Sequence, residues 1–281
     1  MDNTPPAEPA TQADAVPPAP YVVVEEKPKN EWRDLGSFLL KLAIIVFIVR
    51  SFIFSPFSIP SESMLPRLLI GDYLFITKWN YGYSRHSLPF SLPLLPHIPF
   101  ATPERGDVVV FKAPPGNNED WIKRVIGLPG DTVQMRAGQV ILNGQPVPKE
   151  RIADFILPVS PNFACDAEFQ DNDAAGQPIC RFPRYRETLP GGRTYEVLDQ
   201  GNRIMDDTGV YTVPAGRVFM MGDNRDDSRD SRFDDSISYV PIENIQGKAV
   251  FSFWSTDGSA SRLLPWTWFT AARWSRIGEG F

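Results

Sequence analysis

Histidine and cysteine are scarce in this chain, which contains two of each among its 281 residues. Zinc fingers and multi-cysteine metal clusters need more ligands than this, so the composition argues against both. His86 and His97 lie within or just before a proline-rich stretch, residues 88–100, and neither has an HExxH-type spacing. Nothing there indicates the rigid platform that a histidine-based triad needs. The sequence therefore predicts no metal site and no cofactor.

An excess of positive charge is also absent, because 28 Lys and Arg residues stand against 34 Asp and Glu residues, for a net charge of −6. Nucleic-acid-binding proteins normally present a basic face, so no nucleic-acid partner is expected. The mean hydropathy of −0.22 argues against a polytopic membrane protein. Proline, in contrast, is abundant, with 28 residues or about twice the usual share. Because proline interrupts helices, this favours a loop-rich β protein over a helical bundle.

One long apolar run lies near the N-terminus. Residues 1–34 begin with a Pro- and Ala-rich stretch that buries too little apolar surface to fold, which predicts a disordered tail. Residues 35–55 contain LGSFLLKLAIIVFIVRSFIF, and a helix of this length spans roughly 30 Å, the thickness of a bilayer core. A buried core helix and a cleaved signal peptide are the alternatives, but no A-x-A site follows Phe54. We therefore expect an uncleaved, single-pass transmembrane anchor.

The basic residues on either side of this anchor predict its orientation. Lys27, Lys29 and Arg33 precede the apolar run, whereas the next basic residue after Arg50 is Arg67. Positive residues next to a membrane span favour the cytoplasmic side. We therefore expect the N-terminal tail in the cytoplasm and residues 56–281 outside it.

Residues 56–281 have the pattern of a β-rich domain. Asp107–Phe111 is a short apolar run typical of a buried strand, and the runs 132–136 and 139–142 are followed by Asn143-Gly144, a strong hairpin signal. From about residue 146 to 205 the sequence becomes polar, irregular and rich in Pro and Gly, which predicts an insertion. Cys165 and Cys180 both lie in it. An extracytoplasmic location favours a disulfide between them, and two free buried thiols are the alternative.

Hydroxyl and amine groups remain as candidates for chemistry. Ser61 and Ser63 lie between two prolines just after the apolar run, although such a segment is also typical of a plain turn. Lys123 lies in the middle of an apolar run, and strand alternation would place it on the same face as Trp121 and Val125. A lysine buried there would have a lowered pKa and could act as a general base for a serine hydroxyl. A lysine that extends to the strand edge is the alternative.

Five motifs in one order resemble type I signal peptidase, a membrane-anchored serine protease that removes signal peptides from exported proteins. They are PSESMLP, GDYLFITKWNYG from Gly71, RGDVVVFK from Arg105, DWIKRVIGLPGD from Asp120 and MGDNRDDSRDSR from Met221. The resemblance implies a mainly β fold, in which a β-sheet catalytic domain with an inserted second β-rich domain follows a single transmembrane helix. It also implies location in the bacterial cytoplasmic (inner) membrane, with the catalytic domain on the periplasmic side. Lipid bilayer and exported preproteins would be its partners.

The resemblance assigns roles to residues that match the motifs. Ser63 matches the nucleophile and Lys123 the general base, while the Ser63 N–H and the Ser61 hydroxyl match the oxyanion hole. Ser228 matches a serine that hydrogen-bonds to the lysine and orients it. The residues that match structural groups near the site are Arg124, Asp230 and Arg232. Those that match the lining of pockets for small residues at positions −1 and −3 are Phe57, Ile59, Leu68, Leu74, Val110, Trp121 and Ile122.

The sequence also departs from the family at several positions, two of which change the charge near Ser63, and it leaves other functions open. Glu62 stands between the two serines and Arg67 follows Pro66, so the charge around Ser63 differs from that of many members. A non-catalytic extracytoplasmic binding or assembly protein, and a Ser–Lys protease with a different substrate, are the alternatives. The run 263–269 together with Trp274 is rich in tryptophan, which predicts either contact with the membrane interface or ordinary core packing.

Overall fold

The computed structural model describes residues 31–261 and 263–281, so most of the predicted tail, residues 1–30, lies outside the described residues. The chain divides into an N-terminal unit that ends at Ala43 and a larger compact unit, Ile44–Phe281. The first helix, α1 (Glu31–Ile48), continues into a π-helical turn, Val49–Ile53. The helical segment thus begins four residues before the predicted anchor, residues 35–55, and ends two residues before its end. Glu31 and Asp34 lie in its first turn, where negative charge favours a helix start.

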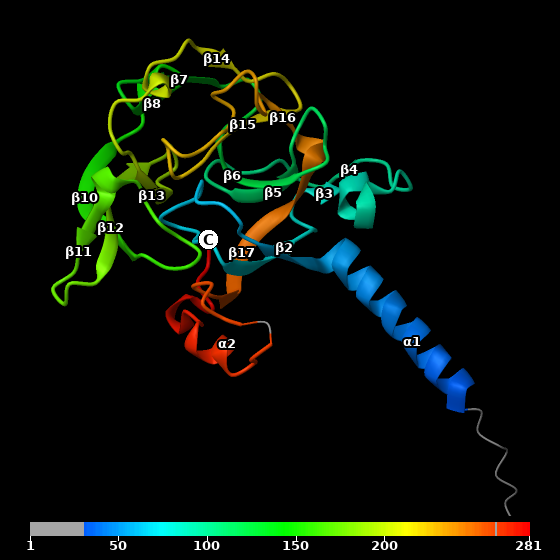
Figure 1. Ribbon diagram of the computed structural model, residues 1–281. Coiled ribbons are helices and arrows are strands. Elements are labelled where there is room, and N and C mark those ends of the chain that lie inside the picture. Colours follow the sequence, from blue (N-terminus) through cyan, green and yellow to red (C-terminus); the bar gives the residue numbers. More distant parts are fainter. Residues whose placement is uncertain (1–30, 262) are drawn as a thin grey trace, which may run out of the picture. The chain divides into compact units, whose positions relative to one another are not determined.

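A seven-stranded antiparallel sheet forms the centre of the larger unit, in the order β1-β2-β17-β5-β6-β15-β16. Strands from the two ends of the sequence lie side by side, because β17 pairs with both β2 and β5 (Figure 1). The strands of this sheet are β1 (Phe54–Ser58), β2 (Asp72–Thr77), β5 (Val108–Lys112), β6 (Asp120–Gly127), β15 (Arg217–Met221), β16 (Val240–Pro241) and β17 (Ile245–Ser255).

Hydrophobic residues cover both faces of this sheet. Val108 and Val110 of β5 belong to one core cluster, whereas Val109 and Phe111 belong to another. Successive side chains of a strand point to opposite faces, so the two clusters lie on opposite faces of the sheet. The apolar run at 107–111 predicts a buried strand, and this prediction is confirmed. The observed strand, Val108–Lys112, begins one residue later than the run. Burial on both faces makes β5 and its neighbour β6 a rigid support for side chains.

Smaller sheets extend this centre. β7 (Thr132–Arg136), β8 (Gln139–Leu142), β9 (Gln145–Pro146) and β14 (Tyr211–Thr212) form a four-stranded sheet. Its β8–β9 turn has positive φ at Asn143 (52°) and Gly144 (77°), as a two-residue hairpin turn requires. The predicted hairpin is confirmed. β3 (Gly82–Tyr83) and β4 (Ile98–Pro99) form a separate pair, and a short helix, α2 (Thr267–Thr270), lies near the C-terminus.

A further four-stranded sheet falls within the segment 146–205. It consists of β10 (Lys149–Pro158), β11 (Gln170–Asn172), β12 (Pro178–Thr188) and β13 (Thr194–Leu198), and β12 pairs with the other three. Its core cluster includes Phe163, Phe182 and Cys180, and a disulfide joins Cys180 to Cys165. This sheet belongs to the same compact unit as the central sheet. The fold is mainly β, as predicted.

Candidate active site

Ser63 and Lys123 are brought into contact although 60 positions separate them. Ser63 lies in the turn between β1 and β2, and Lys123 lies on β6. Their side-chain atoms Oγ and Nζ are hydrogen-bonded at 2.6 Å. Both residues are buried, with 6% and 4% of their surface exposed. A neutral amine in this position can accept the proton of the serine hydroxyl and leave a nucleophilic oxygen.

The surroundings of Lys123 favour that neutral form. Burial lowers the pKa of the Lys123 ammonium to about 8, although Asp230 and Asp223 act in the opposite direction. Its Nζ donates a second hydrogen bond to the Ile122 carbonyl, 3.1 Å away, and lies 5.5 Å from the centre of the Trp121 ring. At mildly alkaline pH about half of the Lys123 side chains are therefore uncharged.

The turn that carries Ser63 is held from two sides. The side chains that follow it, Met64 and Leu65, have no exposed surface and fix the turn in the core. On the other side, the Asn224 N–H donates to the Ser63 carbonyl at 3.1 Å. Gly222 leaves room for this contact, because a Cβ there would lie 2.5 Å from the Ser63 carbonyl oxygen and 2.2 Å from Ser228 Oγ. The turn and the loop after β15 thus fit together only with glycine at 222.

Two groups beside Ser63 can stabilise negative charge. The exposed Ser61 hydroxyl lies 3.4 Å from Ser63 Oγ. The backbone N–H of Ser63 donates no hydrogen bond to a backbone carbonyl of the described residues. A substrate carbonyl oxygen that entered between them would meet two donors, which is the arrangement of an oxyanion hole.

Arg124, Asp230 and Arg232 form buried ion pairs around the loop after β15. Arg124 donates two hydrogen bonds to the Asp223 carboxylate, at 2.7 and 2.6 Å. Arg232 donates to Asp230 at 2.8 and 2.9 Å, and Asp230 also accepts the Gly222 N–H. Burial alone would raise the pKa of Asp230, but Arg232 holds it below its usual value. These pairs fix the loop that supports Ser63.

Ser228 does not have the contact that the resemblance implies. Its Oγ is buried but has no hydrogen-bond partner among the described residues, and Lys123 Nζ bonds instead to Ser63 and to the Ile122 carbonyl. Ser228 Oγ instead packs closely against Gly222. The expected Ser228–Lys123 hydrogen bond is therefore absent.

A cleft of about 530 Å³ opens at Ser63 and Lys123, and it is lined by only part of the predicted pocket residues. Phe57, Trp121 and Ile122 line it. The other four are at most 2% exposed and form the apolar core behind it, namely Ile59, Leu68, Leu74 and Val110. Sequence reasoning missed the polar rim, although two of its members lie inside the matched motif around Met221. The rim residues are Glu119, Asp120, Asp227 and Arg229.

The structure shows where the two departures from the family lie. Burial, with help from Asp227, raises the pKa of Glu62, so this carboxyl is more easily neutralised than usual. Arg67 pairs with Glu279 at 3.0 Å and stacks on the Phe281 ring. Arg67 is therefore engaged by the C-terminal residues rather than by Ser63.

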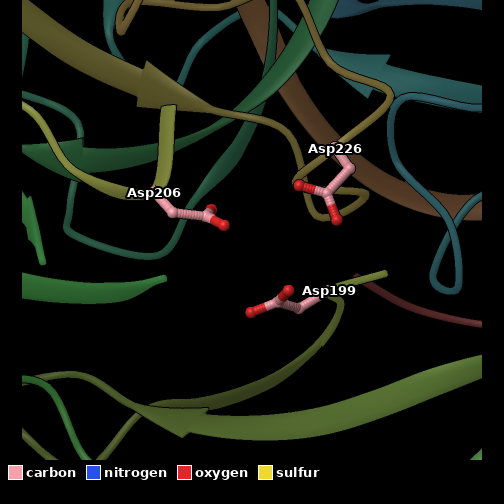
Figure 2. A group of neighbouring side chains, drawn as sticks. All are labelled: Asp199, Asp206 and Asp226. Atoms are coloured by element: carbon pink, nitrogen blue, oxygen red, sulfur yellow. The ribbon is translucent and has the colours of Figure 1, made fainter. Parts of the chain in front are cut away.

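Three carboxylates form a cluster outside the cleft. Asp199, Asp206 and Asp226 point toward one another, with oxygens within 4.8 Å (Figure 2). Burial, together with the two neighbouring charges, raises the pKa of Asp226 to about 6. Lys149 Nζ bonds to Asp199, and backbone N–H groups donate to Asp206 and Asp226. These partners account for the cluster, and we assign no metal to it.

Comparison with known proteins identifies the family. The profile of the family described as "Signal peptidase, peptidase S26" matches residues 32–254. The chain belongs to this family. Its members are serine endopeptidases, and signal-peptide cleavage is the activity that the family name describes.

Curated relatives agree with this assignment. Signal peptidase I of Rickettsia typhi is 36% identical over 238 residues, which cover 81% of this chain and 82% of the relative. Signal peptidase I of Rickettsia massiliae is also 36% identical, over 81% and 80% of the two chains. Among solved structures, a signal peptidase I from Enterococcus faecalis is 24% identical and covers 53% of this chain and 97% of its own. Its TM-score of 0.28 is too low to support the assignment, which rests on the sequences.

Proposed function

We propose that this peptidase is a membrane-anchored serine endopeptidase that cleaves signal peptides from exported preproteins after small residues at −1 and −3. Ser63 is the nucleophile and neutral Lys123 is the general base. The observation that carries the proposal is the buried contact of 2.6 Å between Ser63 Oγ and Lys123 Nζ. A buried amine held against a serine hydroxyl is the arrangement that activates a nucleophile, and a non-catalytic binding protein has no use for this pairing.

The geometry supports a sequence of acyl transfers. Lys123 Nζ takes the proton of Ser63 as Oγ attacks the scissile carbonyl, and the Ser63 N–H and the Ser61 hydroxyl stabilise the oxyanion. The protonated Lys123 then gives its proton to the departing amine, which leaves an acyl-enzyme on Ser63. Water attacks this ester with Lys123 again as base, and Lys123 returns the proton to Ser63 Oγ as the ester bond breaks and the second product leaves with the new carboxylate. No cofactor takes part in these steps.

The helical segment Glu31–Ile53 supports the membrane anchor. Within its 23 residues, an 18-residue window reaches a mean hydropathy of 2.1, and apolar side chains such as Leu40 and Ile45 are exposed, unlike those of a core helix. Lys27 and Lys29 before it and Arg33 in its first turn support an N-terminus in the cytoplasm and a catalytic domain on the periplasmic side of the cytoplasmic membrane. The disulfide Cys165–Cys180 fits an oxidising compartment.

The C-terminal aromatic residues support a second contact with the bilayer. Trp266, Trp268 and Trp274 are 66%, 48% and 55% exposed, so they do not form a core. Tryptophan prefers the membrane interface. The catalytic domain is thus expected to bind liposomes even when residues 1–53, which include the whole helical segment, are removed, and loss of all binding on this truncation would contradict this contact.

Cleavage-site choice tests the proposed substrate. A preprotein with Ala at −1 and −3 should be cut at least about 100-fold faster, in kcat/KM, than one with Leu at both positions. The reason is that Phe57, Ile122 and the buried residues behind them leave little space beside Ser63. Initial rates of processing, followed by gel electrophoresis, measure this. Equal rates for the two preproteins would favour a Ser–Lys protease with a different substrate.

The pH dependence of cleavage tests the role of Lys123. Only the neutral amine accepts the serine proton, so kcat/KM should rise about tenfold per pH unit at low pH and level off above the Lys123 pKa of about 8. Peptide hydrolysis measured from mildly acidic to alkaline pH gives this profile. A rate that stays constant over this range would exclude a lysine base.

A further inference from the structure

A second lysine, Lys78, is buried and forms no ion pair with any residue that the structure describes. It follows directly after β2 and is 3% exposed. Its Nζ makes one hydrogen bond to a described residue, to the Ser87 carbonyl at 3.4 Å, and no ion pair joins it to any described carboxylate. Burial lowers its pKa to about 8. Burying an amine with a single hydrogen bond and no ion pair costs folding free energy, and the proposed catalytic steps do not use Lys78.

Lys78 lines a cavity of about 120 Å³ with two more basic residues, Arg50 and Lys112. This volume exceeds the roughly 10–15 Å³ that one water needs. Asp120 is the one carboxylate among the lining residues, and it already accepts from Lys112 at 2.8 Å and from Gln246. Three cations against one carboxylate leave an excess of two positive charges around the cavity.

Uncharged polar residues and apolar side chains make up the rest of the lining. His86 accepts from Arg85 Nε at 3.2 Å, and burial followed by the Arg85 charge lowers its pKa, so its ring adds no positive charge. Ser55, Ser87 and Ser91 also line this cavity, and the Ser55 hydroxyl donates to the Arg50 carbonyl at 2.7 Å. Ammonium, guanidinium and hydroxyl donors around a small space suit a compact anion with several acceptor oxygens, which is the chemistry of a phosphate group.

The position of the cavity along the chain indicates where such a phosphate comes from. Arg50 lies in the π-helical turn that ends the helical segment Glu31–Ile53, and Ser55 and Phe57 lie on β1 directly after it. A residue at the end of a membrane span lies at the level of the lipid headgroups. Basic residues there attract anionic lipids.

We propose that this cavity binds the phosphate group of an anionic phospholipid. The proposal rests on the membrane anchor of the proposed function, since only that brings the cavity to headgroup level. Phe57 and Asp120 line both this cavity and the substrate cleft. A bound headgroup therefore lies beside β1 and the start of β6, and holds the cleft at the membrane surface where signal peptides emerge.

Lipid binding by the full chain in nonionic detergent tests the proposal. Isothermal titration calorimetry with a short-chain phosphatidylglycerol should show one bound lipid per chain. Lys78→Met and, independently, Arg50→Gln should each weaken binding at least tenfold. Lys149→Met removes one charge from a lysine elsewhere, paired with Asp199, and should leave the affinity unchanged. Thermal unfolding followed by circular dichroism verifies that each variant is folded.

The outcomes separate this proposal from its alternatives. Unchanged affinity in folded Lys78→Met and Arg50→Gln, or equal weakening by Lys149→Met, would overturn the site. Inorganic phosphate that binds as tightly as the lipid would assign the cavity to free phosphate and overturn the lipid proposal. The titration involves no proteolysis, so it is independent of the proposed cleavage. A failed anchor would appear separately, as a full chain that stays soluble without detergent.

Discussion

Replacing Ser63 with alanine is expected to lower kcat for preprotein cleavage by about 10⁴- to 10⁶-fold. The hydroxyl is the attacking group, and Ser61, although only 3.4 Å away, makes no hydrogen bond to Lys123 that could activate it in its place. Single-turnover cleavage of a preprotein with an A-x-A junction measures the loss. Lys123→Met should cause a loss of similar size, because it removes the proton acceptor and keeps the apolar stem.

The double variant provides the stricter test, since the losses in kcat from substituting residues that act as one unit do not add. Ser63→Ala combined with Lys123→Met should be no slower than either single variant. Ser58→Ala, at an exposed serine on β1, and Lys149→Met are the matched controls and should retain wild-type rates. Cleavage at wild-type rates by Ser63→Ala or Lys123→Met would contradict the dyad and return the non-catalytic alternative to consideration.

Much of the fold follows from local patterns in the sequence. The apolar run at 107–111 and the Asn143-Gly144 turn predict a strand and a hairpin that are both present. Pairing across the sequence has no such signal. The central sheet places β17 between β2 and β5, where one of its faces is largely buried and both of its edges are paired. Long-range contacts of this kind depend on packing rather than on any short stretch of residues.

The active site also combines features that local sequence predicts with contacts that it does not. Ser63 alone predicts a turn and Lys123 alone predicts a lysine at a strand edge, and only the order of the motifs connects them. Their contact exists because β6 is fixed in the sheet while the Asn224 N–H holds the Ser63 carbonyl. The exposure of the pocket residues was harder to predict. Ile59 and Val110 match a family pattern, but that pattern does not tell a cleft wall from the core layer behind it.

A buried ion pair joins the inserted sheet to the loop that supports Ser63. Glu187 of β12 and Arg225 of the loop are fully buried and share two hydrogen bonds, at 2.7 and 2.6 Å. The Tyr195 hydroxyl donates to the same carboxylate at 2.5 Å. Burial alone would raise the pKa of Glu187, but Arg225 holds it below its usual value. The carboxylate is therefore charged whenever the protein is folded near neutral pH.

Glu187→Met is expected to destabilise the protein by about 3–5 kcal/mol, because it leaves the Arg225 guanidinium buried without a counter-charge. For a domain of this size that corresponds to a fall in Tm of roughly 6–20 °C. Activity should fall as well, because Arg225 follows directly after Asn224, which holds the Ser63 carbonyl. Thermal unfolding by circular dichroism, with cleavage rates at a temperature where the variant is folded, measures both effects.

The double variant Glu187→Met, Arg225→Met distinguishes a lost attraction from an unpaired charge. Removing both charges replaces the pair with apolar side chains, which often costs little stability. Most of the lost Tm should therefore return in the double variant, while Lys149→Met combined with Glu187→Met should restore none of it. If the double variant is as unstable as the sum of the two single variants, the pair contributes no coupling. The inserted sheet would then be held to the Ser63 loop by the backbone bonds between Leu198 and the segment Asp223–Arg225 instead.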